Sequence, residues 1–121
     1  MKLIRAIEAT SGGEEGTGTF SGRVTLRSVA RIETAAGMAV VHFHDGARTH
    51  WHSHSGGQVL HVLAGSGRVQ SEGRPVEELQ PGDFVVAEPG EKHWHGAAVG
   101  ESMAHISLAA GDAEWFEPVA G

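Results

Sequence analysis

The 121-residue chain contains no cysteine. This absence excludes disulfide bonds, thiolate zinc sites, iron–sulfur clusters and cysteine nucleophiles, because each of them requires a cysteine sulfur. Any metal site must therefore use imidazole, amide or carboxylate ligands. Redox logic leaves the compartment open, and a reducing cytoplasm is the simplest prediction.

Basic residues are also few. The chain has 9 lysines and arginines against 15 aspartates and glutamates, a formal net charge of −6, and its only lysines are Lys2 and Lys92. Without a basic stripe, we expect no binding of nucleic acid through its phosphates. No apolar run approaches the length of a membrane span, and the N-terminal apolar stretch is too short for a secretion signal. We therefore expect a soluble cytoplasmic protein with no nucleic-acid or membrane partner.

Glycine is abundant, with 18 residues, and it separates short apolar runs together with other turn residues. A helical period is missing except for a weak signal at residues 114–117. Segment 10–22 is expected to be a loop or lead-in arm, and Gly-Ser-Gly at 65–67 a hairpin turn. Strands are expected at residues 24–32, 38–44, 58–64, 68–72, 84–88, 93–99 and 103–108. Short strands at roughly regular spacing predict an all-β sandwich or barrel, and the length fits one domain.

All nine histidines lie between His42 and His105. His52 and His54 are two residues apart, so an extended strand points both side chains to one face. Gln58 follows closely enough for a turn to bring its amide oxygen to the same place. By the same period, His93 and His95 share a face, and one of them would supply a third imidazole.

Three imidazoles and one oxygen leave two positions of an octahedral metal open for substrate or water. Histidine with oxygen ligands suits Mn, Fe, Co, Ni or Zn. Because Gln58 is neutral, the metal keeps its full charge, which strengthens its Lewis acidity toward a bound hydroxyl or carbonyl. The pattern therefore predicts one divalent metal ion.

The strand at 103–108 alternates polar and apolar side chains. If its polar face looks into the barrel, His105 enters the pocket as a base or proton relay, and otherwise it is a hydrogen-bonded core histidine. The apolar residues Val41 and Phe43 would line the same pocket. This lining favours a small apolar or aromatic substrate.

These motifs resemble those of a small single-domain cupin. The first cupin motif, with Gln in its acidic position, is matched by Gly46, His52, His54, Gln58 and Gly65, and the second by Gly82, Gly90 and His93. The resemblance implies an all-β cupin β-barrel, a double-stranded β-helix of the jelly-roll type. It makes residues 1–121 one domain, with an arm at 1–21, a core at about 22–110 and a tail at 111–121.

A narrower resemblance is to the bacterial manganese-dependent cupin hydroxynitrile lyases and the cupins found beside carboxymuconolactone decarboxylase-like proteins. It is carried by segments 47–49, 51–54, 57–60, 81–83 and 89–97. In that subgroup the acidic ligand is likewise Gln, so Gln58 supports this branch. Residue by residue, the resemblance implies metal ligands at His52, His54, Gln58 and His93, pocket histidines at His95 and His105, and substrate-lining positions at Ala39, Val41 and Ala109.

The resemblance therefore predicts a manganese-dependent lyase, with Fe, Zn, Ni or Co as alternative metals. The metal would bind the hydroxyl of an aromatic cyanohydrin of the mandelonitrile type, and His105 or His95 would take its proton, in cleavage or in synthesis. An iron-dependent cupin dioxygenase and a non-enzymatic small-molecule-binding cupin stay open as alternatives. A homodimer or higher homo-oligomer, paired through strand edges, is implied by the same resemblance.

Overall fold

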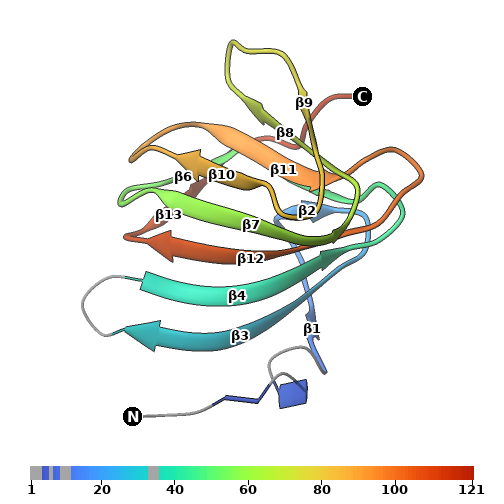
Figure 1. Cartoon of the computed structure of the whole chain (residues 1–121). Helices are drawn as coiled ribbons and strands as arrows, with labels where there is room; N and C mark the ends of the chain where they lie inside the picture. The colour runs from blue at the N-terminus through green and yellow to red at the C-terminus, as the bar shows by residue number, and fades with distance from the viewer. Residues whose placement is uncertain (1–3, 6, 9–11, 33–35) are drawn as a thin grey trace.

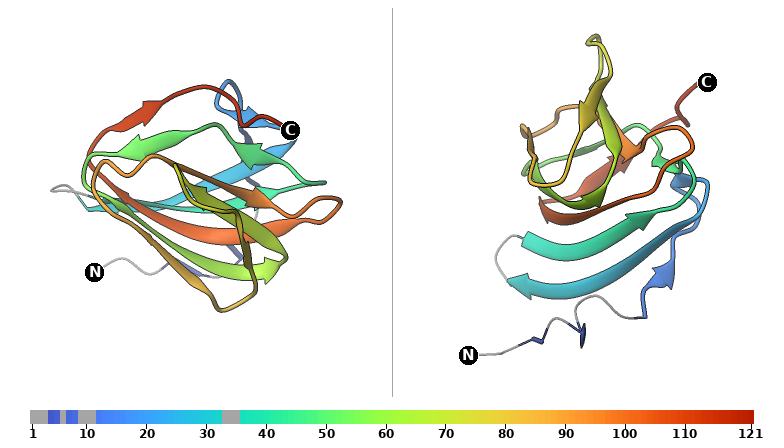
Figure 2. Two further views of the ribbon diagram at one scale, coloured as in Figure 1. Left: turned by 90° about the horizontal axis from the view of Figure 1, so that it is seen from above. Right: turned by 45° about the vertical axis from the view of Figure 1, so that its right-hand side comes forward.

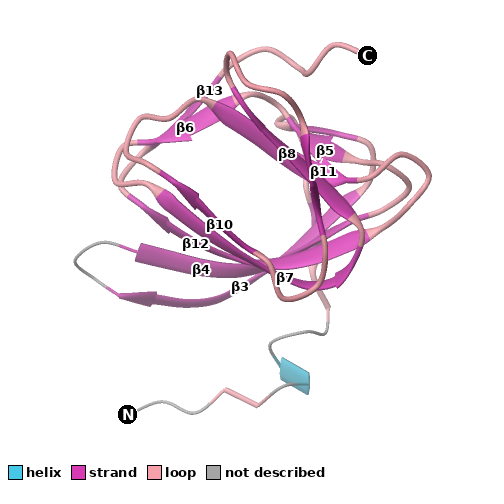
Figure 3. Cartoon of the chain, turned by 45° about the horizontal axis from the view of Figure 1, so that its top comes forward, coloured by secondary structure: helices cyan, strands magenta, loops and turns pink. Residues whose placement is uncertain are grey.

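The computed structural model describes residues 4–5, 7–8, 12–32 and 36–121, and these residues form thirteen strands in two facing sheets (Figures 1 and 3). The first sheet, sheet A, contains in spatial order β1 (Glu14–Glu15), β3 (Val24–Ile32), β4 (Ala36–Phe43), β12 (Met103–Ala110), β7 (Gln58–Gly65) and β10 (Phe84–Ala87). The second sheet, sheet B, contains β13 (Ala113–Trp115), β6 (His52–His54), β11 (His93–Ala97), β5 (Arg48–Thr49) and β2 (Phe20–Ser21), and also β8 (Gly67–Ser71) and β9 (Glu77–Leu79). The predicted all-β barrel is confirmed.

All seven predicted strands are present, and their ends differ from the prediction by at most two residues. The segment predicted as a loop contains the short strands β1 and β2, while its first residues, 10 and 11, lie outside the described part of the chain. Residues 113–115, which overlap the weak helical signal at residues 114–117, form strand β13 instead, and this strand pairs with β6. The division into arm, core and tail stays a prediction.

The prediction of a hairpin turn at residues 65–67 is wrong. In the pairing of the described strands, β7 lies between β12 and β10 in sheet A, whereas β8 pairs with β11 and β9 in sheet B. The glycines therefore mark a crossing from one sheet to the other. Gly65 has φ +80°, and a Cβ on it would collide with the carbonyl oxygen of Ser102, so the crossing requires glycine at this point.

The barrel interior changes from apolar to polar along its length. Near one end, Val24, Phe43, Val62, Ala97 and Met103 form a buried hydrophobic cluster. Further along β7, β11 and β12, the inward positions are occupied by buried polar side chains, namely Gln58, His93, His95, His105 and Ser107. The apolar end is close-packed and supports the strands that carry the polar group.

The β8–β9 hairpin projects from the barrel (Figures 1 and 2). Among the described strands, β9 pairs with β8 alone and β10 pairs with β7 alone. Sheet A therefore ends at β10, and the hairpin branch of sheet B ends at β9. Backbone pairing does not close the barrel between these two edges.

Candidate metal centre

Strands β6 and β11 bring two His-x-His pairs together. His93 is the register partner of His52 across the two strands, and their ring centroids are 4.4 Å apart. One ring nitrogen from each of His52, His93 and His95 lies within 4.8 Å of the others, and all three side chains are buried. In the described part of the chain, these three histidines form the group of side chains that is arranged to hold a metal ion.

Backbone carbonyls orient two of these rings. His52 Nδ1 donates to the carbonyl of His50 at 2.9 Å, and His93 Nδ1 donates to the carbonyl of Glu91 at 2.8 Å. With Nδ1 protonated in a neutral ring, the lone pair is on Nε2. Such a hydrogen bond is the usual way in which a protein orients a metal-binding histidine.

Gln58 completes this part of the site. It follows Gly57, whose φ of +87° permits the turn into β7, and its side-chain Nε2 donates to Ser107 Oγ at 2.9 Å. Its Oε1 therefore faces His93 Nε2, at 2.9 Å. In this arrangement two lone pairs point at each other, which is unfavourable unless a cation lies beside both.

The donor set fits a divalent metal. Adjacent ligand atoms in a six-coordinate site with bonds of about 2.1 Å lie about 3 Å apart, close to the distance between His93 Nε2 and Gln58 Oε1. His54 Nε2 and His95 Nε2 are buried and have no hydrogen-bond partner among the described residues. Buried polar atoms without a partner require an explanation, and an ion supplies one. The His54 ring lies 5.1 Å from that of His52, although His54 is outside the group of three.

The electrostatics keep the imidazoles neutral. Burial, and then the neighbouring His93, lowers the pKa of His52 from 6.5 to about 3. Burial likewise lowers the pKa of His54, with His93 adding to the effect, and the pKa of His93 itself. Because a metal binds the neutral imidazole and not the protonated one, the site is ready to accept an ion near neutral pH.

His95 and His105 form a buried pair next to the cluster. His105 Nε2 and His95 Nδ1 are 3.0 Å apart, so one ring donates a hydrogen bond to the other. Burial and the nearby His105 lower the pKa of His95 well below its usual value, and burial lowers that of His105 to about 4. The structure places His95 among the clustered rings and His105 behind it, on the strand of sheet A that also carries Ser107.

The three predicted substrate-lining residues lie directly across the strands from residues of the site. In the register of sheet A, Ala39 is opposite Ser107, and Val41 is opposite His105. Ala109 is opposite Gln58. Val41 is also part of the buried apolar cluster.

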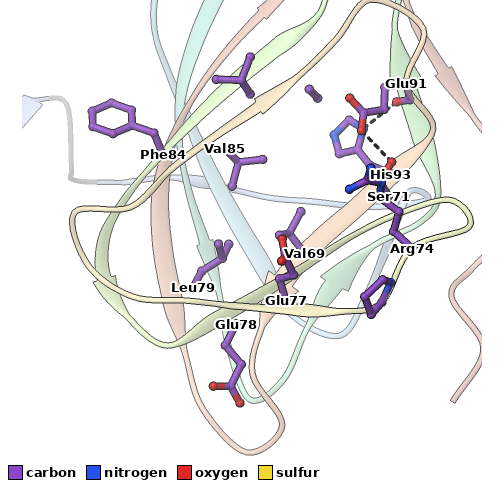
Figure 4. A pocket seen from close by; sticks show the side chains of 13 residues that line it. Val69, Ser71, Arg74, Glu77, Glu78, Leu79, Phe84, Val85, Glu91 and His93 are labelled. Carbon is purple, nitrogen blue, oxygen red and sulfur yellow. Dashed lines mark hydrogen bonds between the residues drawn. The ribbon is translucent and has the colours of Figure 1, made fainter.

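A cleft of about 800 Å³ leads from the surface to His93. It lies between the β8–β9 hairpin and β10, and Figure 4 shows His93 at one side with Val69, Leu79 and Val85 along the wall. Ser71 and Glu91 stand beside His93, joined by a 2.7 Å hydrogen bond from Ser71 Oγ to Glu91 Oε2. Ala39, Val41 and Ala109 do not line this cleft.

The sequence profile of the family described as Cupin domain matches residues 39–117, more than half of the chain. The chain is a cupin. Within the residues that the structure describes, no helix has the length and apolar character needed to cross a membrane.

This cupin is 42% identical over 107 residues to a protein of Granulicella tundricola named (R)-mandelonitrile lyase, covering 87% of this chain and 82% of that protein. It is 40% identical to a crystallised cupin-like protein of Thermotoga maritima, with a TM-score of 0.86, covering 89% of this chain and 87% of that one. The polyketide cyclase RemF of Streptomyces resistomycificus has the same fold, with a TM-score of 0.76 at 19% identity, covering 100% of this chain and 87% of that one. The predicted resemblance to the cupin hydroxynitrile lyases is thus confirmed.

Two neighbours of the cupin site were not identified from the sequence. Trp115 on β13 is the register partner of His52 and stacks on its ring, with centroids 4.5 Å apart. Thr49 Oγ1 accepts a 3.2 Å hydrogen bond from the backbone N–H of His95. The position of Trp115 depends on which strand β13 joins, and the local pattern of residues 113–115 carries no signal of that choice.

Proposed function

We propose that this cupin is a metal-dependent hydroxynitrile lyase that cleaves or forms an aromatic cyanohydrin of the mandelonitrile type. The observation that carries the proposal is the 42% identity, over most of both chains, to an (R)-mandelonitrile lyase in a chain that also buries a three-histidine cluster. Fold likeness alone would not support it, because one fold serves many reactions.

We assign the metal ligands to His52, His54, Gln58 and His93, with manganese as the preferred ion and Fe, Zn, Ni or Co as alternatives. The nitrogen and oxygen donors, without sulfur, are compatible with all of these ions. When bound, the metal supplies Lewis acidity that stabilises negative charge on the substrate oxygen. Ser107 holds the Gln58 amide with its oxygen turned toward His93.

His95 is the residue proposed to take the proton of the cyanohydrin hydroxyl. Its lowered pKa leaves the ring neutral near pH 7, with a lone pair available, and its Nε2 has no hydrogen-bond partner among the described residues. As the proton moves to His95, the carbon–carbon bond breaks, the aldehyde forms, and the bond's electron pair leaves with cyanide. Return of that proton gives hydrogen cyanide and restores the ring.

His105 is proposed as the relay behind His95. The 3.0 Å contact between His105 Nε2 and His95 Nδ1 lets a proton gained on one side of the His95 ring be balanced by a shift toward His105 on the other. Synthesis of the cyanohydrin uses the same groups in reverse. Ala39, Val41 and Ala109 would contact the substrate from sheet A.

The proposal extends to assembly and location. A homodimer or higher homo-oligomer is supported by apolar side chains on the side of sheet A that faces away from sheet B. Val86 and Leu108 are 63% and 38% exposed there. Val59 lies on the strand between them and is the register partner of both. A cytoplasmic location stays a prediction from composition.

The test is benzaldehyde release from racemic mandelonitrile by manganese-loaded protein, compared with the metal-free protein at the same pH. We expect metal-dependent release with a preference for one enantiomer. Chiral chromatography of the remaining substrate measures that preference. Release equal to that of the metal-free control would contradict the proposed lyase.

One observation favours a second candidate, an iron-dependent dioxygenase. The three clustered imidazoles form a neutral nitrogen-rich set of a kind that also suits iron. Substrate-dependent oxygen uptake by iron-loaded protein would support this activity, and its absence with a panel of aromatic substrates would argue against it.

A further inference from the structure

We propose that the cleft between the β8–β9 hairpin and β10 is the route by which substrate reaches the metal centre, and that Val69, Leu79 and Val85 on its wall select for an aryl group. The inference rests on the proposed lyase function for the identity of the substrate. The location of the route rests on the structure of the cleft.

The inner end of the cleft touches the site. His93 lines it directly, and so does Ala87, the register partner of Gln58. A molecule seated at this end would meet β11, which carries the proposed ligand His93, and β10, which pairs with the strand that carries Gln58. The cleft therefore ends where the reacting group must be placed.

The other end of the barrel is filled by buried apolar side chains of the described strands. Phe43, Val62 and Met103, each at most 2% exposed, belong to the apolar cluster that fills it. Protein interiors of this kind are packed too densely to admit a small molecule without rearrangement. By contrast, the edges of β9 and β10 face each other across the cleft, and the described strands make no ladder between them. The opening is thus a consequence of the sheet topology.

The chemistry of the wall fits an aromatic ring. Leu79 is part of the buried apolar cluster, and Val69 and Val85 pack against it. Val85 is opposite Leu60 in the register of β10 and β7, so it lies on the inward side of sheet A. The outer part of the cleft is bordered by charged residues, Arg74, Glu77 and Glu78. An apolar inner wall with a polar rim is typical of a small-molecule site, and about 800 Å³ lies in the usual size range.

The polar corner of the cleft is held rigidly. Glu91 accepts from Ser71 Oγ at 2.7 Å and from the backbone N–H of Glu88 at 2.8 Å, and its carbonyl orients His93. The pKa of the Glu91 carboxyl is lowered, chiefly by the hydrogen bond from Ser71. The apolar wall around Val85 is therefore the place where a change of size can alter substrate choice without disturbing His93.

The experiment narrows the cleft with Val85→Phe and uses Val99→Phe as the matched control, because Val99 is 80% exposed and does not line the cleft. Each metal-loaded variant is assayed with mandelonitrile and with lactonitrile, the small cyanohydrin of acetaldehyde, and its metal content is measured. For Val85→Phe we expect kcat/KM for mandelonitrile to fall about tenfold or more, the scale of steric discrimination in apolar pockets. The value for lactonitrile should change less than threefold, as should both values for Val99→Phe, with metal content unchanged. No loss, or an equal loss for both substrates, would overturn the selecting role of this wall.

A second measurement needs neither metal nor turnover. Benzyl alcohol is titrated into metal-free wild-type protein while the methyl resonances of valine and leucine are followed by NMR. Shifts concentrated at Val69, Leu79 and Val85 would support the route, and shifts elsewhere or none would overturn it. If Val85→Phe does not fold, Val85→Ala replaces it, with a larger kcat/KM expected for a naphthyl cyanohydrin relative to mandelonitrile and an unchanged ratio as the contrary result. If the wild-type protein does not cleave mandelonitrile but the NMR shifts are confined to the cleft, the lyase function is rejected and the route is still supported.

Discussion

Acid should unfold the metal-free protein much more readily than its carboxyl content alone would suggest. His52 and His105 are 1% and 0% exposed, and burial lowers their pKa values from 6.5 to about 3 and about 4. Below pH 6.5 the unfolded chain takes up a proton at each position, whereas the folded chain does not. Stability is therefore complete above pH 6.5 and is lost as the pH falls toward the folded-state values.

The size of the loss follows from these values. Each such histidine costs about 1.4 kcal/mol of unfolding free energy per pH unit once its unfolded form is mostly protonated. Because that form is already half protonated at pH 6.5, lowering the pH from 6.5 to 5.0 costs about 3 kcal/mol for the pair. This is a large part of the roughly 5–15 kcal/mol that stabilises a typical domain. The lowered pKa values of His54, His93 and His95 act in the same direction. Carboxyl groups with ordinary pKa values near 4 contribute little in this window.

The assay is urea denaturation of protein in a metal chelator at pH 7.5, 6.5, 5.75 and 5.0, followed by tryptophan fluorescence. His105→Gln is the matched variant, because it removes one of the two titrations. Its overall stability is expected to be lower, but its slope against pH should be smaller than that of the wild type by about 1.4 kcal/mol per unit. A wild-type stability that changes by less than about 1 kcal/mol between pH 6.5 and 5.0 would contradict proton uptake by these buried histidines on unfolding, as would equal slopes for the two proteins.

Three further predictions concern the site. Replacing His52 and His54 together with Ala should abolish metal binding and leave a soluble fold, and an unchanged metal stoichiometry by native mass spectrometry would contradict the ligand assignment. His105→Ala should retain the metal but lose most mandelonitrile turnover, because His95 loses its hydrogen-bond partner; unchanged turnover would remove His105 from the mechanism. Ser107→Ala frees the Gln58 amide and should weaken metal affinity about 10- to 100-fold, the usual scale for a residue that supports a ligand, while Ser107→Thr, which keeps the hydroxyl, should retain more of it. Competition with a fluorescent chelator measures this effect, and equal affinities of Ser107→Ala and the wild type would show that the hydrogen bond does not position Gln58.

Much of this protein follows from the sequence alone. The alternation of side chains along a strand is a local property of the backbone, so the two-residue spacing of His52 and His54 is enough to place both on one face. The same holds for the strands themselves, because turn residues separate short apolar runs clearly enough to predict seven strands to within two residues. The cupin resemblance extended these local signals to a fold and a reaction class. The family match over residues 39–117 confirms the fold, and the identity to an (R)-mandelonitrile lyase supports the reaction class.

Tertiary structure decided what depends on contacts between distant strands. Gly65 and Gly67 look like a hairpin locally, but the next strand joins the other sheet, and turn chemistry does not specify a partner. The close approach of His95 to His52, the stacking of Trp115 on His52 and the cleft beside Val85 arise from strands far apart in the chain. Local residue patterns determine which way a side chain points, whereas the packing of the whole barrel determines what it meets.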